Sequence, residues 1–160
     1  MITNYDSEAI VKIYRMLSKK CDVIDRFINN HAYYFGPYTE EFGASDVCNN
    51  IIDLITRKNQ LINLKIIVDN AINKLSPKDK KVLMIKMHYS ISINEMCGIL
   101  NLKERTAFRR IEQAFDNLAD ALNRSKYADR IERIINNEDW ICAIREDVKD
   151  RRLAYHSNMN

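Results

Sequence analysis

The chain has 160 residues, a formal net charge of +3 and a hydrophobic fraction of 46%. This apolar content is enough for a buried core in one domain or two small ones, which excludes a chain too polar to fold. Only three Gly and two Pro interrupt the chain, so we expect an all-α fold of long helices. Because the net charge is modest, binding of nucleic acid would depend on local clusters of basic residues.

The first expected element is an amphipathic helix over residues 7–29. Its apolar positions recur at the spacing of one helical face and are Ile10, Ile13, Leu17, Ile24 and Phe27. A loop over 31–46 follows, with a turn at Gly36 and Pro37 and the aromatic residues Tyr33, Tyr34, Phe35, Tyr38 and Phe42. Two roles remain open for these aromatics: a satellite core beneath the helices, or an anchor for a protein partner such as a polymerase. Stacking on single-stranded nucleic acid is disfavoured, because the loop has no Arg or Lys to hold the backbone.

The second expected helix starts at a cap formed by Asp46 and runs to residue 73. Its apolar residues on an a/d heptad register are Val47, Ile51, Leu54, Leu61, Val68 and Ile72. Lys58 and Lys65 occupy two other positions of the same seam and weaken a pure coiled-coil interpretation. Two interpretations remain open: the two helices pack on each other and on the rest of the chain, or the seam joins two subunits in a homodimer.

A basic stretch and a short helix come next. Between residues 74 and 86 five lysines accompany a single acidic residue, Asp79; they are Lys74, Lys78, Lys80, Lys81 and Lys86. Ser92 and Glu95 then form an SxxE capping box, which predicts a helix from residue 93. Its apolar face is expected to contain Met96, Ile99 and Leu100. Asn101 tolerates the left-handed conformation, so we expect the helix to end there in a sharp turn.

A longer helix begins near Glu104 and has two distinct faces. Its apolar stripe comprises Ala107, Ile111, Ala114, Phe115, Leu118 and Leu122. The polar residues around its start are the candidate DNA-binding residues: Lys103, Arg105, Thr106, Arg109, Arg110 and Gln113. Arg donates two hydrogen bonds to guanine and Gln pairs with adenine, so these side chains are suited to base recognition in the major groove. The weaker candidates, for phosphate contacts, are Lys78, Lys80, Lys81 and Ser92.

These residues resemble region 4 of the sigma-70 type factors of bacterial RNA polymerase. The resemblance starts at LSPKDKKVL, passes through HYSISINEMCGILNL and ends in KERTAFRRIEQAFDNLADAL, about a third of the chain. It implies a scaffold helix, a helix-turn-helix that binds double-stranded promoter DNA, and a contact with RNA polymerase. In this chain Asn101 replaces the usual Gly of the turn, and Lys103 replaces the usual Ser or Thr cap. Phe108 stands where the family often has a polar residue facing DNA, and we favour its packing on a neighbouring helix.

The N-terminal half shows no counterpart of sigma region 2, which melts promoters, so we do not expect this chain to open promoters unaided. A helical N-terminal stretch followed by a sigma-like helix-turn-helix is similar in layout to small phage and mobile-element regulators, such as late-gene activators of the ArpU and RinA type. The sequence thus divides into a helical hairpin over 1–73, a DNA-binding segment over 74–124 and a C-terminal extension over 125–160.

The C-terminal extension is expected to contain two short helices separated by a break at NNED, residues 136–139. Their apolar residues are Tyr127, Ile131, Ile134 and Ile135 in the first and Trp140, Ile141, Ile144 and Val148 in the second. Three roles remain open for the extension: covering the core, exchange with a second subunit, or contact with the transcription machinery. Residues from about Tyr155 are expected to fray.

The chain shows no pattern of an enzyme or of a metal site. Its cysteines, Cys21, Cys48, Cys97 and Cys142, are widely spaced, without a CxxC motif or a His at ligand spacing. We expect reduced, mostly buried thiols in a cytoplasmic protein, because neither a signal peptide nor an apolar run long enough for a bilayer is visible. No nucleophile and base pair or glycine-rich phosphate loop stands out, so we expect no enzymatic activity and no cofactor.

The sequence therefore predicts a DNA-binding transcription regulator, with double-stranded DNA and RNA polymerase as expected partners. Two alternatives remain: an assembly protein such as the DNA-recognising small subunit of a phage packaging machine, or a polymerase-binding or anti-sigma protein without DNA binding.

Overall fold

A computed structural model describes residues 1–34, 44–89 and 91–157, and for a few residues at the edges of these ranges only the backbone. Within these ranges the chain forms helices and no strands, as the expected all-α class requires. The helices are α1 (Asn4–Tyr34), α2 (Ala44–Asn73), α3 (Pro77–His88), α4 (Ile93–Leu100), α5 (Glu104–Asn123), α6 (Ala128–Asn137) and α7 (Asp139–Ser157).

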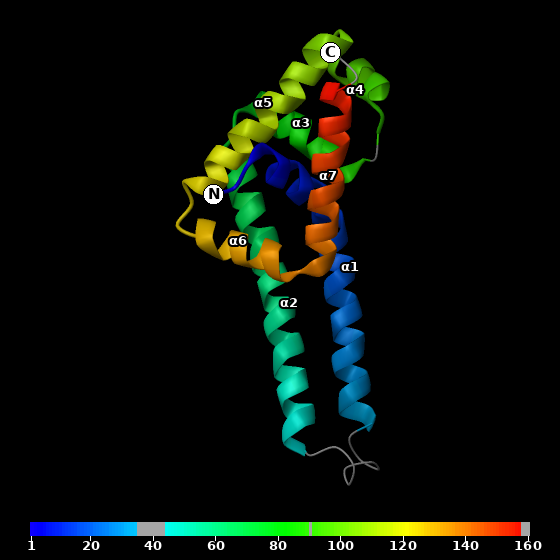
Figure 1. The fold of residues 1–160 in the computed structure, drawn as a ribbon, viewed down its shortest axis with the longest axis vertical. Helices are drawn as coiled ribbons and strands as arrows, with labels where there is room; N and C mark the ends of the chain where they lie inside the picture. Colours follow the sequence, from blue (N-terminus) through cyan, green and yellow to red (C-terminus); the bar gives the residue numbers. More distant parts are fainter. Residues whose placement is uncertain (35–43, 90, 158–160) are drawn as a thin grey trace.

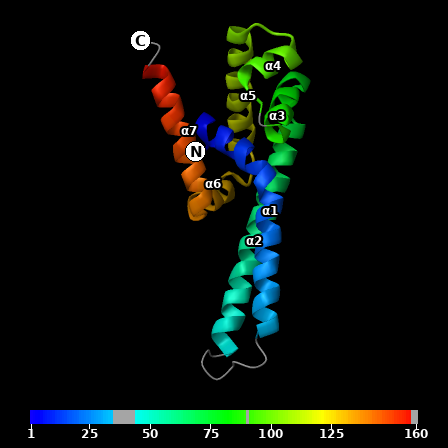
Figure 2. The same ribbon diagram turned by 90° about the vertical axis from the view of Figure 1, so that its right-hand side faces the viewer.

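The two longest helices, α1 and α2, lie side by side in opposite directions (Figure 1). The C-terminal half of α1 and the N-terminal half of α2 project beyond the other helices, as the view turned by 90° also shows (Figure 2). The remaining helices gather around the other ends of this pair. α5 and α3 lie on one side of α1, and α7 runs along α1 on another (Figures 1 and 2).

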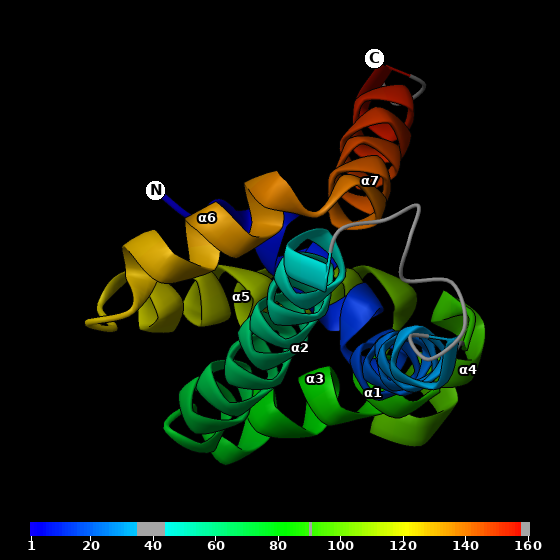
Figure 3. The same cartoon turned by 90° about the horizontal axis from the view of Figure 1, so that it is seen from below.

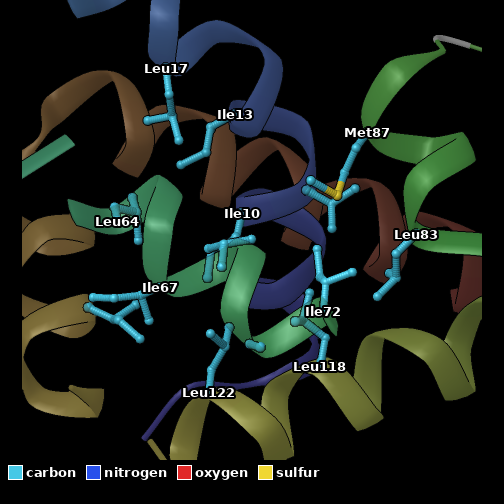
Figure 4. Packing of buried hydrophobic residues seen from close by; sticks show 14 of the residues in the cluster. Ile10, Ile13, Leu17, Leu64, Ile67, Ile72, Leu83, Met87, Leu118 and Leu122 are labelled. Carbon is cyan, nitrogen blue, oxygen red and sulfur yellow. The ribbon is translucent and has the colours of Figure 1, made fainter. Parts of the chain in front are cut away.

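One buried hydrophobic cluster contains residues from all seven helices. Figure 4 shows its centre, where Ile10 of α1, Ile72 of α2, Leu83 of α3 and Leu118 of α5 point toward one another. The three segments expected from the sequence meet in this cluster, and their boundaries fall in the short connections 74–76 and 124–127. The chain therefore builds one core from its hairpin, its central helices and its C-terminal helices.

The predicted heptad seam of α2 faces α1 of the same chain. Leu61, Val68 and Ile72 are buried, and the two lysines of the seam reach α1. Lys58 Nζ donates to Asp25 at 2.6 Å, and Lys65 Nζ donates to Ser18 Oγ at 3.0 Å. Each lysine keeps its ammonium group near the surface while its apolar stem covers the seam. This arrangement corresponds to the first of the two interpretations, packing within one chain.

Several expected boundaries are wrong by a few residues. α1 begins at Asn4 rather than near residue 7, because Thr3 and Asp6 cap it: Thr3 N donates to Asp6 Oδ2 at 2.7 Å. It also continues to Tyr34, beyond the predicted start of the loop. Asp46 lies inside the first turn of α2 and does not precede it. α7 is helical to Ser157, and the expected fraying from about Tyr155 stays a prediction, because the side chains from Tyr155 onward lie outside the described residues.

One expected core residue is exposed and one group lies outside the described residues. Phe27 is 54% exposed, because it lies on the part of α1 that projects beyond the central helices. The aromatic residues of the predicted loop are Tyr33, Tyr34, Phe35, Tyr38 and Phe42, and their side chains lie outside the described residues. The choice between a satellite core and a partner anchor therefore stays a prediction.

The C-terminal helices join the core through a buried carboxylate. Glu138 separates α6 from α7 and is 4% exposed, and both of its carboxylate oxygens accept hydrogen bonds from Arg57 of α2 at 2.7 Å. Trp140 Nε1 donates to the same carboxylate at 2.7 Å. A buried carboxylate needs such partners to offset its lost hydration. The break predicted at residues 136–139 is thus a single residue that fixes α2, α6 and α7 together.

Tyr14 links α1 to α2 and gives a measurable pH dependence. Its hydroxyl donates to Asp69 Oδ1 at 2.5 Å, and burial followed by this hydrogen bond raises the pKa of Tyr14 to about 12. The fold favours the protonated phenol, so this contribution to stability is fully present below pH 10 and is lost as the pH rises through 12. Tyr14→Phe should lower the free energy of unfolding at neutral pH by about 1–3 kcal/mol, as for a hydrogen bond to a charged group.

Urea unfolding at pH 7 and absorbance titration of phenolate test this prediction. The difference titration between the two proteins should show one tyrosine that ionises near pH 12. Equal stabilities at pH 7, or a missing tyrosine that titrates near pH 10, would contradict it.

Within the described ranges, none of the helices combines the length and the apolar composition needed to cross a membrane.

Candidate nucleic-acid interface

The start of α4 has the local structure that its sequence predicts. Ser92 Oγ accepts the backbone N–H of Glu95 at 3.3 Å, and Glu95 Oε2 accepts the backbone N–H of Ser92 at 2.7 Å. This is a complete capping box, and hydrogen bonds from the backbone and hydroxyl of Ser92 lower the pKa of Glu95. The Ser92 hydroxyl, a weak candidate for phosphate contact, also donates to Glu95 at 2.8 Å and is therefore engaged in the cap.

The apolar face of α4 is only partly buried. Met96 is fully buried and Leu100 is partly buried against the core, whereas Ile99 is 51% exposed. The expectation that all three share a core face is therefore wrong for Ile99. The reason is geometric: α4 has eight residues, about two turns, and α5 is the helix that it packs against, which leaves one flank of α4 open.

Asn101 ends α4 in the left-handed conformation, with φ 52° and ψ 49°. It is the one non-glycine residue with positive φ among the described residues. The N–H of Leu102 donates to the carbonyl of Cys97 at 3.0 Å, which satisfies a carbonyl at the end of the helix. The connection from α4 to α5 therefore spans only residues 101–103 and turns the chain sharply, as the sequence predicts.

Substitution of Asn101 tests this turn. Asn101→Ala should lower the free energy of unfolding by about 1 kcal/mol, because an alanine Cβ is strained in the left-handed region. Asn101→Gly should be more stable than the alanine variant, since glycine adopts positive φ without this strain. Urea unfolding of the two variants beside wild type is the measurement, and equal stability of the alanine and glycine variants would contradict the prediction.

α5 buries the apolar stripe expected from the sequence. All six predicted residues are buried, together with Ala119: Ala107, Ile111, Ala114, Phe115, Leu118 and Leu122. No side chain caps the start of α5, since Lys103 at the N-cap position has no acceptor for a backbone N–H. The buried stripe fixes the rotation of α5 about its axis, and this rotation decides which polar residues face solvent.

The candidate DNA-binding residues lie on the solvent-exposed side of α5 or directly before it. Lys103, Arg105, Thr106, Arg109 and Gln113 are exposed, and Arg110 is half-buried. Among the described residues, no carboxylate forms an ion pair with Lys103, Arg105, Arg109 or Arg110. Gln113 donates to Asn117 Oδ1 at 3.1 Å, one helical turn further along.

Three other arginines of the chain, unlike those at the start of α5, form ion pairs within the molecule. Arg57, Arg145 and Arg152 form ion pairs with the carboxylates of Glu138, Asp6 and Glu8 that connect separate helices. The basic residues at the start of α5 make no such structural contact within the described chain. Four cations at the start of α5 therefore have no ion-pair partner, beside one acidic residue of the first turn, Glu104, although the net charge of the chain is only +3.

α3 holds the second group of candidates. Ser76 caps α3, with Pro77 in the first turn, and Asp79 N donates to Ser76 Oγ at 3.2 Å. Lys78 and Lys81 are exposed, and Lys80 is half-buried and donates to Asn73 Oδ1 at 2.6 Å. Of the other lysines in this stretch, Lys86 is half-buried, and burial lowers its pKa. The candidate phosphate-binding lysines are therefore at the start of α3, whereas Lys86 faces inward.

The contact between α3 and α5 is polar as well as apolar. Asp79 Oδ2 accepts a hydrogen bond from Ser76 Oγ at 2.7 Å and another from Asn117 Nδ2 at 2.8 Å. Asp79 is buried, so these bonds replace the hydration that its carboxylate loses. The sequence analysis treated Asp79 only as a lone negative charge among lysines and assigned no role to Asn117.

Phe108 lies on the side of α5 that faces other helices. It is half-buried and lines a cavity of about 390 Å³ together with Ile93, Ile111, Phe115 and Val148. These lining residues come from α4, α5 and α7, so Phe108 faces a space between helices, and its packing on a neighbouring helix stays a prediction.

The sequence analysis missed one residue that holds α5 in place. Arg152 of α7 donates to Glu8 of α1 at 2.7 Å and to Glu112 of α5 at 2.7 Å. Its guanidinium group also lies over the rings of Tyr5 and Phe115, at 5.3 and 5.7 Å from their centres. The C-terminal extension therefore covers the core and braces the helix that carries the candidate DNA-binding residues.

Of the four cysteines only Cys21 is buried and Cys48 is exposed, so the expectation of mostly buried thiols is wrong for the described residues. No group of three or more His, Cys, Asp or Glu side chains among them is placed to hold a metal ion. Comparison with known proteins gives no match, since no family model, curated protein or solved structure is similar enough to this chain. The function is therefore inferred from the residues themselves.

Proposed function

We propose that this protein is a sequence-specific DNA-binding transcription regulator in which α4 and α5 act as a helix-turn-helix. α5 enters the major groove with its first turns, and Arg105, Arg109, Arg110 and Gln113 contact base edges. Lys103 and Thr106 at the start of α5 hold phosphate oxygens, as do Lys78 and Lys81 at the start of α3.

The observation that carries the proposal is the unpaired basic surface at the start of α5. Lys103, Arg105 and Arg109 are exposed on a helix whose opposite side is buried, directly after a sharp turn. An exposed Arg without a carboxylate partner keeps its full donor capacity for an external acceptor, and guanine and phosphate are both matched to its fork geometry. The exposed residues of 103–109 include these three cations and a single carboxylate, that of Glu104, and this excess of positive charge favours an anionic partner.

The resemblance to sigma region 4 extends the proposal to promoter DNA and to RNA polymerase. In this interpretation α3 corresponds to the scaffold helix, and α4 and α5 to the helix-turn-helix. The protein then modulates transcription by binding beside a promoter, with polymerase as its protein partner.

Selection of bound sequences from a random duplex pool tests the proposal. We expect enrichment of one motif, and we expect affinity for this motif to fall as salt is raised because Lys and Arg contacts release counterions. A folded protein that enriches no motif would overturn the proposal. If the same protein then bound RNA polymerase without salt dependence, a polymerase-binding or anti-sigma role would replace it, and a ring of many subunits would favour an assembly role.

A further inference from the structure

A second apolar line runs along α2 and faces solvent. It contains Ile52, Ile55, Ile62 and Ile66, which are 58%, 43%, 38% and 51% exposed. Isolated exposed isoleucines are ordinary, but these four lie on one line of one helix and form an apolar stripe that only Asn59 interrupts. Such surfaces on a helix usually contact another helix.

The spacing of this line follows a heptad repeat. Ile52, Asn59 and Ile66 are seven residues apart and take the a positions, while Cys48, Ile55 and Ile62 take the d positions. The run from Cys48 to Ile66 contains no charged residue at any a or d position. Its length, about 28 Å, corresponds to nearly three heptads.

This line is separate from the seam that α1 covers. Lys58 and Lys65 point to α1, and Arg57 points to Glu138 between α6 and α7. Seen from below, α1 and α6 lie on different sides of α2 (Figure 3). α1 and α6 therefore occupy two sides of this part of α2, and among the described residues the isoleucine line faces solvent on another side.

We propose that this face of α2 binds α2 of a second copy of the chain in a parallel, two-stranded coiled coil from Cys48 to Ile66. A two-fold interface must be complementary to itself. Isoleucines that meet isoleucines satisfy this condition, and so does Asn59, because an amide group both donates and accepts hydrogen bonds and can pair with the same amide of the second copy.

Asn59 decides the direction of the two helices. In a parallel pair each a position meets the same a position, so Asn59 meets Asn59 and every isoleucine meets an isoleucine. In an antiparallel pair a positions meet d positions, and the Asn59 amide would face the methyl groups of Ile55 or Ile62. A polar group buried without a partner is unfavourable, which selects the parallel arrangement.

The residues that flank the line are compatible with this pairing. In a parallel coil, g positions oppose e positions of the other helix, so Lys58 and Lys65 would oppose Asn63 and Asn70, which are uncharged. The next d position after Ile62 is Asp69, whose carboxylate accepts the hydrogen bond of Tyr14. Two such carboxylates would repel each other, so the coil ends at Ile66 and the helices diverge toward α3.

The parallel direction has a consequence for the rest of the molecule. α3, α4 and α5 follow the C-terminal end of α2, so both copies would carry these helices at the same end of the dimer. An antiparallel pair would place them at opposite ends. The inference goes beyond the proposed function and none of its tests uses DNA, so the two can fail separately.

Sedimentation velocity with the full chain is the first test. Wild type should be a dimer at about 0.1 mM, where even a weak specific association is populated. Ile55→Glu with Ile62→Glu should give a monomer with an unchanged helical circular dichroism spectrum. The matched control is Phe27→Glu, which replaces another exposed apolar residue, outside the line, and should stay dimeric. A monomeric wild type, or a double variant that stays dimeric, would overturn the proposal.

Two further variants test the number and the direction of the helices. Ile at both a and d positions favours three or more strands, and a single Asn at an a position specifies two, so Asn59→Ile should give trimers or larger species. In a Cys97→Ser, Cys142→Ser background, a short bismaleimide should join exposed Cys48 to Cys48 of the second copy. An Asn59→Ile protein that remains dimeric would overturn the role of Asn59, and a dimer that fails to crosslink would overturn the parallel direction.

Discussion

Replacement of Arg109 and Arg110 by alanine is expected to lower affinity for the selected DNA motif by about 30-fold to 20,000-fold. Each bidentate contact with a guanine contributes about 1–3 kcal/mol of discrimination, and two contacts together contribute about 2–6 kcal/mol. Binding to unrelated duplexes should weaken far less, because Lys78, Lys81 and Lys103 still contact phosphates. The measurement is fluorescence anisotropy at fixed salt with the selected duplex and with a scrambled duplex of the same composition.

A matched control separates base recognition from simple loss of charge. Arg26 lies on the projecting part of α1 and Arg130 on α6, and both are exposed. The Arg26→Ala, Arg130→Ala protein has the same net charge as the test variant and should bind both duplexes as wild type does. If the test variant preserved its preference for the motif, the assignment of Arg109 and Arg110 as base-reading residues would be wrong.

Leu118→Ala is expected to lower the free energy of unfolding by about 2–5 kcal/mol, as buried Leu to Ala changes do. Leu118 has no exposed surface and lies where α5 meets Ile72 of α2 and Leu83 of α3 (Figure 4). Removal of its side chain leaves a cavity between three helices that cannot all move to fill it. Since domains are typically stable by about 5–15 kcal/mol, the variant loses a large share of its stability.

Urea unfolding followed by circular dichroism measures this loss. Ile99→Ala is the control, because Ile99 is apolar but 51% exposed on α4, and its change should cost well under half as much. Equal losses for the two variants would show that the core is not organised around α5.

The parts of this structure that the sequence predicts well depend on residues close together in the chain. The capping box of α4 needs only Ser92 and Glu95, and the turn needs only Asn101. The buried stripe of α5 follows from the helical spacing of its apolar residues alone, because one side of a long helix must face the core. The all-α class follows in the same way from composition and period.

The parts that the sequence could not predict depend on which helices become neighbours. Arg152 and Glu8 are separated by 144 positions, and no local pattern connects them. The bond from Asn117 to Asp79 likewise spans 38 positions. Ile99 and Phe27 fit an apolar period but lack a neighbouring helix to cover them.

The helix α2 also shows that the sequence does not predict which helices become neighbours. It carries two apolar lines at heptad spacing, one with Leu61 and Val68 and the other with Ile55 and Ile62. Period alone cannot say which line α1 will cover. The sequence analysis considered a homodimer through the first line, whereas the structure assigns that line to α1 and leaves the second one open.

The bond between Asn117 and Asp79, together with the buried apolar contact between α3 and α5, holds these two helices against each other. The distance between the lysines that begin α3 and the arginines that begin α5 is therefore set when the chain folds, before any ligand arrives. A ligand that contacts both groups meets preorganised charges, and the backbone loses little conformational entropy on binding. The exposed side chains still lose conformational entropy on binding. Selectivity between ligands depends on how well the spacing of a ligand's charged groups matches the fixed spacing of these cations.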